Sequence, residues 1–195
     1  MDKEKLELIS KNFVEMLLLT GRHGIVDLTR YMQEETDFFT APASTKYHEA
    51  FEGGLLQHSM NVLKCLDNEA RMAGYDYDSI LIVALLHDIC KANCYGKETR
   101  NVKEDGKWVE KQVYTYQDDL PLGHGEKSLY LISKFIKLTD EEAAAIRWHM
   151  GGFDSAFRGG DRGLNIAFEK YPLAVLLHLA DMKATYIVER RDGND

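Results

Sequence analysis

The feature that most constrains this fold is a run of aliphatic residues that ends in an adjacent histidine and aspartate. Residues 82–86 are all aliphatic, His87 and Asp88 follow directly, and Lys91 comes three residues after the aspartate. The apolar run predicts a buried helix. Consecutive helical positions diverge by about 100°, so neighbouring side chains can share one cation only if other segments supply further ligands. The pair therefore predicts partners elsewhere in the chain.

Other metal-ligating residues stand in settings that suit such partners. Read along the chain, the full set is His58, His87, Asp88, His124, His149 and Asp181. Asp181 lies on the apolar stripe of an expected helix, where a carboxylate is costly to bury unless something pairs with it. A coordinated cation is the simplest solution. Mixed imidazole and carboxylate ligands suit iron, manganese, nickel or zinc, and the sequence does not choose among these metals and magnesium.

In its order and spacing, this set resembles the HD-domain metal-dependent phosphohydrolases, a helical superfamily named for the His-Asp pair. The resemblance covers about residues 47–186. It implies an all-α, HD-domain-like helical bundle of the small stand-alone bacterial type. A single His-Asp dipeptide carries no weight, but an ordered set of six is specific. The resemblance also implies one divalent ion held by four residues: His58, His87, Asp88 and Asp181.

Two further histidines imply a second divalent ion. The superfamily has members with only the four-residue core and binuclear members with two added histidines, and His124 and His149 match the second pattern. Asp88 would then bridge the ions. Two ions about 3.5–4 Å apart can hold a hydroxide and bind a phosphate oxygen. The alternative is that both histidines are ordinary helix-end residues.

Several residues are candidates for contacts with a phosphorylated substrate. Asp88 and Lys91 are the expected catalytic residues, with Lys91 stabilising charge on the phosphoryl group. The alternative for Lys91 is a helix-end lysine that faces the helix dipole. His48 is expected at the mouth of the site, or else is a hydrogen-bonded loop histidine. Lys97 and Arg100 are weaker candidates for distal phosphates, because charged hairpins are usually just solvated.

Four other polar residues lie near the motif in the sequence. Glu126 follows His124 by two residues and is placed to orient a ligand or water. His178 shares a helix face with Asp181 and is a candidate to support a ligand by hydrogen bonding. Glu52 and Asp154 are loop carboxylates, for which proton transfer is a less favoured role.

Apolar periodicity predicts a mostly helical single domain, 1–195. Expected helices cover about 3–20, 25–35, 55–73, 78–88, 122–136, 139–149 and the residues after Pro172, with Asp78 and Thr139 as N-caps and a glycine-rich loop over 151–163. Residues 1–45 form an N-terminal helical extension. Residues 95–121 break the helical pattern, and Asp105-Gly106 between β-prone runs predicts a hairpin within 100–116. The hairpin is expected to be a lid or a subunit contact, which leaves a homo-oligomer open.

Composition narrows the class of partner and the location. With a net charge of −8, the chain is a poor match for long nucleic acids, which favour basic surfaces. The three cysteines fit reduced thiols, and Cys94 is a minor candidate for a place beside the site. No stretch reaches the roughly 20 apolar residues of a membrane span, and the charged N-terminus lacks a signal sequence. We expect a cytoplasmic protein with no membrane contact.

These observations favour a metal-dependent phosphohydrolase that acts on a nucleotide or related small phosphoester through metal-activated water. Two alternatives stay open. One is a non-catalytic, nucleotide-binding HD module, and the other is a phosphodiesterase for single-stranded nucleic acid. The full ligand set together with Lys91 favours an enzyme over a binding module, and the acidic charge weighs against the nuclease.

Overall fold

The fold is that of a helical body with one projecting β-hairpin. It is given by a computed structural model, which describes residues 1–104 and 106–190. The helices in this part of the chain are α1 (Lys3–Leu19), α2 (Ile25–Glu34), α3 (Gly54–Met72), α4 (Tyr77–Leu86), α5 (His124–Ser133), α6 (Asp140–Trp148), α7 (Ser155–Arg158), α8 (Gly163–Lys170) and α9 (Pro172–Lys183). The strands are β1 (Tyr95–Glu104) and β2 (Lys107–Tyr116). The predicted all-α class with a hairpin insertion is confirmed.

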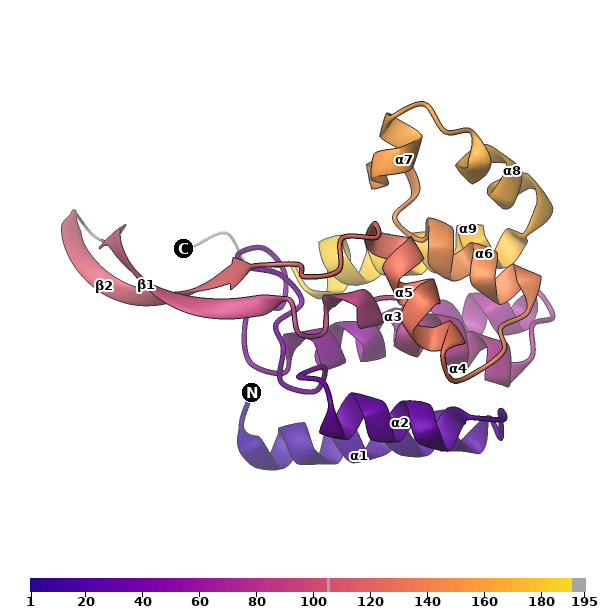
Figure 1. Cartoon of the computed structure of the whole chain (residues 1–195), viewed down its shortest axis with the longest axis horizontal. Helices are drawn as coiled ribbons and strands as arrows, with labels where there is room; N and C mark the ends of the chain where they lie inside the picture. The colour runs from indigo at the N-terminus through magenta and orange to yellow at the C-terminus, as the bar shows by residue number, and fades with distance from the viewer. Residues whose placement is uncertain (105, 191–195) are drawn as a thin grey trace.

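Helix α4 lies at the centre of the body. All its residues from Ser79 to Leu86 are buried, as expected for a helix that is apolar on every side. It packs against α1, α3 and α6, while α9 packs against α3 and α6. Helices α1 and α2 thus cover one side of the α3–α4 layer, and α5, α6 and α9 lie on the other (Figure 1). Buried residues of α1 to α6 and of α9 form one hydrophobic cluster.

Two helix starts test the capping signals read from the sequence. The predicted N-cap Asp78 is wrong, because it lies inside the first turn of α4. The cap is Asp76, whose side chain accepts a hydrogen bond from the Ser79 backbone N–H at 2.9 Å. At α6, Thr139 and Glu142 form the predicted capping box, with reciprocal hydrogen bonds of 2.8 and 3.2 Å.

The hairpin is longer than predicted. Its strands pair antiparallel from Tyr95 opposite Tyr116 at the base to Glu104 opposite Lys107 at the tip, and it extends away from the helical body (Figure 1). Asp105 of the predicted turn lies outside the described residues. At the base, the Tyr95 hydroxyl donates to the Ala43 carbonyl oxygen at 3.1 Å, which ties the arm to the body. A subunit contact through the arm stays a prediction.

The glycine-rich stretch after α6 has more structure than the predicted loop. It contains a helical turn, Gly151–Phe153, then the short helix α7, and it leads into α8. Asp154 organises this stretch, because its carboxylate accepts hydrogen bonds from the backbone N–H groups of Ala156 and Phe157. Within the described residues, no helix is both long and apolar enough to cross a membrane.

The central position of α4 gives a stability prediction. Ile82 is fully buried within the main core. Replacing a buried isoleucine with alanine removes its transfer free energy and leaves a cavity, at a cost of about 2–5 kcal/mol. We therefore expect Ile82→Ala to lower the free energy of unfolding by that amount in urea titrations. Ile166→Ala, at a 62% exposed position on α8, is the control and should change it by less than about 0.5 kcal/mol. Equal effects of the two substitutions would contradict this packing.

Candidate metal centre

The end of α4 lets two neighbouring side chains face one centre. The helix ends at Leu86, His87 is its C-cap, and a 3-10 turn, Ile89–Lys91, follows. Asp88 has left helical geometry, with φ −106° and ψ 16°. As a result, His87 Nε2 and Asp88 Oδ2 lie 3.5 Å apart. The backbone turn thus brings together two neighbouring side chains that would point about 100° apart in a regular helix.

One oxygen of the Asp88 carboxylate faces the first group of predicted ligands. Asp88 Oδ2 lies 3.5 Å from the Nε2 atoms of both His58 and His87. His58 comes from α3, which packs along α4. Asp181, from α9, places its Oδ1 3.2 Å from His58 Nε2. Three helices therefore bring together the four residues expected at the first ion.

The other oxygen of Asp88 faces the two added histidines. Asp88 Oδ1 lies 2.7 Å from His124 Nε2 and 3.4 Å from His149 Nε2. His124 is the first residue of α5, and His149 is the C-cap of α6. The carboxylate thus separates the histidines into two pairs, one on each oxygen. This is the arrangement that a bridging aspartate requires.

Hydrogen bonds made by Nδ1 leave the Nε2 atom of two of these histidines as an acceptor. Nδ1 of His87 donates to the Ala84 carbonyl at 2.9 Å, and Nδ1 of His149 donates to the Ile146 carbonyl at 2.7 Å. A carbonyl oxygen only accepts, so the proton sits on Nδ1 and Nε2 carries a lone pair. In the described part of the chain, both Nε2 atoms are buried without a hydrogen-bond partner. Buried polar atoms are nearly always paired, and a cation beside Asp88 would satisfy both.

The protonation of the histidines at the centre also fits a metal site. Burial lowers the pKa of His87 to about 4, so its ring is neutral, as a metal ligand must be. Burial also opposes protonation of His58, but hydrogen bonds to Asp181 and Glu189 outweigh it and raise the His58 pKa to about 9. The carboxylates that favour a proton there would equally favour a metal cation. The donor set therefore fits divalent metal binding.

Comparison with known proteins identifies the fold family. A profile of the HD domain matches residues 55–185. The chain belongs to the HD-domain family. It is 38% identical over 109 residues to the dihydroneopterin 2',3'-cyclic phosphate phosphodiesterase of Methanocaldococcus jannaschii. That alignment covers 53% of this chain and 39% of the relative, so the chain spans well under half of that protein. No solved structure is significantly similar to this chain.

The HD-domain centre opens into a cavity of about 830 Å³. Asp88, Lys91 and Asp181 line it together with the predicted mouth residue His48. Its other lining residues are Lys46, Tyr47, Met150, Phe153, His178, Met182, Thr185, Tyr186, Glu189 and Arg190. A pocket in the range of about 300–1,000 Å³ suits a small molecule.

Two predicted phosphate contacts lie away from this cavity. Lys97 and Arg100 belong to β1, and neither is among the residues that line the cavity. Arg100 forms an ion pair with Glu98 on its own strand, and Lys97 lies 5.3 Å from the ring centre of Tyr114. The geometry therefore gives no support to a substrate role for these two cations.

The four polar residues that lie near the motif in the sequence have different surroundings in the structure. His178 Nδ1 donates to the backbone carbonyl of His149 at 2.6 Å, so it supports the C-terminal end of α6. Glu126 and Asp154 both form ion pairs with Arg147. These contacts support a structural role for the two carboxylates and give no support to a role in proton transfer. Glu52 is not among the residues that line the cavity.

Two cysteines lie close to the centre. Cys90 Sγ lies 3.5 Å from His124 Nδ1, so it, and not the predicted Cys94, is the thiol nearest to this ligand set. Cys94 instead contacts the Lys127 ammonium group at 3.1 Å. The 3-10 turn explains the difference, because it carries Cys90 toward α5 directly after Asp88.

Glu189 also lies at this centre, and the sequence did not indicate it. It follows a π-helical turn, Ala184–Val188, and its buried carboxylate contacts the rings of His48 and His58. In the sequence it is one acidic residue within the charged stretch Glu189-Arg190-Arg191-Asp192. No periodicity or spacing distinguishes it from a solvated glutamate.

Proposed function

We propose that this HD-domain protein is a metal-dependent phosphohydrolase that acts on a nucleotide or a related small phosphoester. The observation that carries the proposal is the pair of buried, unpartnered Nε2 atoms of His87 and His149, which flank Asp88 beside a cavity. Buried lone pairs around a carboxylate have no role in a purely structural core. They do have one in a metal centre.

We propose two ion positions, one on each oxygen of Asp88. His58, His87 and Asp181 would hold one ion with Oδ2, and His124 and His149 would hold the other with Oδ1. When bound, the divalent ions would supply the Lewis acidity that lowers the pKa of water and neutralises charge on a phosphate. The identity of the metals is open among iron, manganese, nickel, zinc and magnesium.

Lys91 is the proposed phosphate contact of the chain itself. Its Nζ atom lies 2.7 Å from Asp88 Oδ2, and it lines the cavity. Burial disfavours the charged form, but the neighbouring carboxylate of Asp88 outweighs it and raises the pKa of the lysine above its usual range. The ammonium group therefore stays charged, and it is placed to stabilise negative charge that develops on a phosphoryl group.

The cavity walls favour a substrate that carries a flat ring. Tyr47, Phe153 and Tyr186 line the cavity and are 75%, 47% and 59% exposed, so their rings are free to stack on a heteroaromatic group. Lys46 and Arg190 add positive charge to the lining. The similar phosphodiesterase is named for a 2',3'-cyclic phosphate. Cyclic phosphodiesters therefore belong beside nucleoside mono- and triphosphates among the substrates to test.

A substrate panel tests the proposal. Protein loaded with Mn²⁺ or Zn²⁺ should hydrolyse at least one nucleotide or cyclic phosphodiester, and a chelator should remove the activity. If the loaded protein binds nucleotides without turnover, the non-catalytic binding module is the correct function. Preferential cleavage of single-stranded oligonucleotides would instead favour the nuclease alternative.

Replacing Lys91 tests its role in catalysis. Lys91→Met keeps the aliphatic stem and removes the charge, so we expect kcat to fall by about 10²–10³, the effect of losing one charge-stabilising group. Metal content should stay the same, since ammonium is not a metal ligand. Lys97→Met, a matched change on the projecting hairpin, should leave kcat unchanged. A Lys91→Met protein with full kcat would show that this is an ordinary helix-end lysine.

A further inference from the structure

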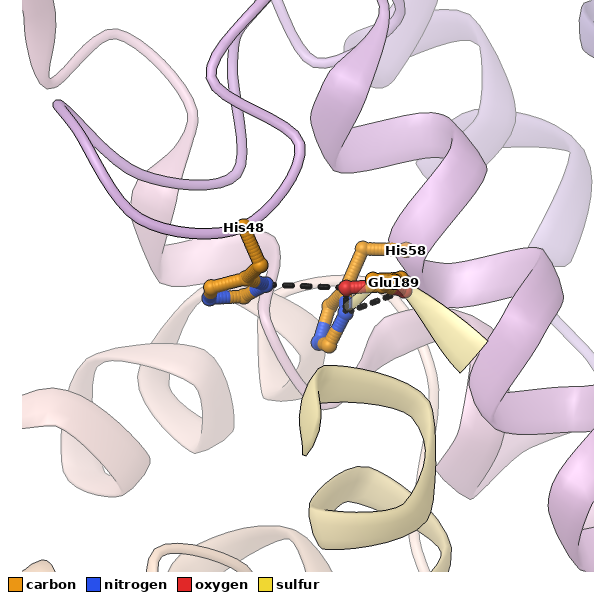
Figure 2. A group of neighbouring side chains, drawn as sticks. All are labelled: His48, His58 and Glu189. Carbon is orange, nitrogen blue, oxygen red and sulfur yellow. Dashed lines mark hydrogen bonds and ion pairs between the residues drawn. The ribbon is translucent and has the colours of Figure 1, made fainter. Parts of the chain in front are cut away.

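Glu189 holds two histidines at once. Its Oε1 lies 3.0 Å from His58 Nδ1, and its Oε2 lies 2.9 Å from His48 Nδ1 and 3.1 Å from His58 Nδ1. The amide of Asn61 donates a further bond to Oε1 at 2.9 Å. Figure 2 shows the Nδ1 atoms of both imidazole rings joined by dashed lines to the carboxylate of Glu189, which lies beside the His58 ring.

Both carboxylate oxygens of Glu189 have hydrogen-bond donors. Three donor groups serve the two oxygens, and the side chain of Glu189 is fully buried. The two oxygens face nitrogen atoms of three side chains, His48, His58 and Asn61. A carboxylate that accepts from all three satisfies each of these contacts. Each histidine must then present an N–H at Nδ1.

That constraint decides how His58 can serve the metal centre. With its proton held on Nδ1, a neutral His58 has its lone pair on Nε2, the atom that lies 3.2 Å from Asp181 and 3.5 Å from Asp88. A free imidazole divides its proton between both nitrogens and rotates about its side-chain bonds. The carboxylate removes both freedoms, which raises the affinity of a ligand for its metal.

The chain that leads to Glu189 is built to reach this position. Helix α9 carries Asp181, and the π-helical turn Ala184–Val188 follows it, closed by a hydrogen bond from the Glu189 N–H to the Ala184 carbonyl at 2.9 Å. A single segment therefore places one carboxylate on each nitrogen of His58. π-Helical turns inside helical segments are often found at functional sites.

The same carboxylate reaches the substrate side of the centre. His48 lines the cavity, and its ring centre lies 4.9 Å from that of His58. It comes from the irregular stretch before α3, where no helix or strand fixes its orientation. Its hydrogen bond to Glu189 supplies that orientation, so Nδ1 faces the carboxylate and the opposite edge of the ring is left for the cavity.

We propose that Glu189 is a positioning residue that fixes the ring orientations of His58 and His48 together, which makes the segment after α9 part of the active site. The inference rests on the proposed metal-dependent function. It assigns Glu189 two separate effects, one on metal affinity through His58 and one on substrate binding through His48.

Metal titration of the substrate-free protein tests the first effect. Glu189→Gln keeps the shape of the side chain, but its amide cannot accept from both rings and satisfy Asn61. We expect calorimetry with Mn²⁺ to show unchanged stoichiometry and affinity that is about 10- to 100-fold weaker. Glu142→Gln is the matched control, because the side chain of Glu142, at the start of α6, is as fully buried as that of Glu189. It should bind Mn²⁺ as the wild type does, even if it is less stable.

A second variant separates the two effects. His48→Ala should leave Mn²⁺ affinity unchanged and raise KM for the substrate found in the panel, while Glu189→Gln should change both quantities. In the wild-type protein with Zn²⁺, ¹⁵N spectra of the histidine rings should show His58 and His48 protonated at Nδ1. This readout needs no variant, so it holds even if Glu189→Gln fails to fold.

Each result decides a definite question. Wild-type Mn²⁺ affinity in Glu189→Gln, or a proton on Nε2 of His58, would overturn the role of Glu189 while leaving the proposed function standing. A wild-type protein that binds no divalent metal would instead overturn the proposed function, and this inference with it.

Discussion

Replacing Asp88 with alanine should remove the bound metal and abolish hydrolysis. Both oxygens of this carboxylate face imidazole nitrogens, His58 and His87 on one side and His124 and His149 on the other. Its loss would take a ligand from both proposed ions at once. We expect metal analysis to show less than one ion per chain, and kcat to fall by at least about a thousandfold, since metal assistance is worth several kcal/mol in the transition state.

Asp76→Ala is the control for this substitution. Asp76 caps the start of the same helix, α4, so its loss should cost about 0.5–2 kcal/mol of stability without touching the centre. Its metal content and kcat should match the wild type. An Asp88→Ala protein that retains the wild-type metal content would show that the carboxylate is not a ligand.

The double variant His124→Ala/His149→Ala should keep about one metal per chain and lose most of its turnover. These histidines face Asp88 Oδ1, whereas His58 and His87 face Oδ2, and Asp181 contacts His58. Removing them should empty one position and leave the other. Losing one of two ions that share the work of catalysis should cost on the order of a thousandfold in kcat.

The variant His23→Ala controls for the loss of a histidine remote from the centre. His23 lies in the turn between α1 and α2, and its removal should change neither metal content nor kcat. If the double variant binds as much metal as the wild type and keeps its activity, the centre is mononuclear. Lys91 would then be the main phosphate contact.

The parts that sequence predicted well are those whose signal is local or ordered along the chain. The apolar run before His87 predicted the central helix, because only a buried helix tolerates such a sequence on every side. The ordered set of six predicted a convergence that the structure shows around Asp88. Its role in metal binding remains a prediction. The capping box at Thr139 was equally local, because both partners lie within one turn.

The parts that sequence missed depend on tertiary position. Glu189 contacts His58 only because the π-helical turn brings the two side chains together, and nothing in the neighbouring residues indicates that contact. At α4, two aspartates two residues apart both suit an N-cap, and only the backbone path selects Asp76. The hairpin begins at Tyr95, earlier than predicted, because cross-strand partners extend strands whose own sequence has weak β propensity.

The central claim, that this HD domain adds water to the phosphorus of a small phosphoester, is tested most directly by isotope incorporation. Metal-loaded protein is incubated in H₂¹⁸O with nucleoside mono- and triphosphates and 2',3'-cyclic phosphates, and the products are examined by ³¹P NMR. We predict ¹⁸O in the phosphoryl group of the product from at least one substrate with the wild-type protein, and none above background with Asp88→Ala. A fully metal-loaded wild-type protein that leaves every compound intact, or places no ¹⁸O on phosphorus, would contradict this function.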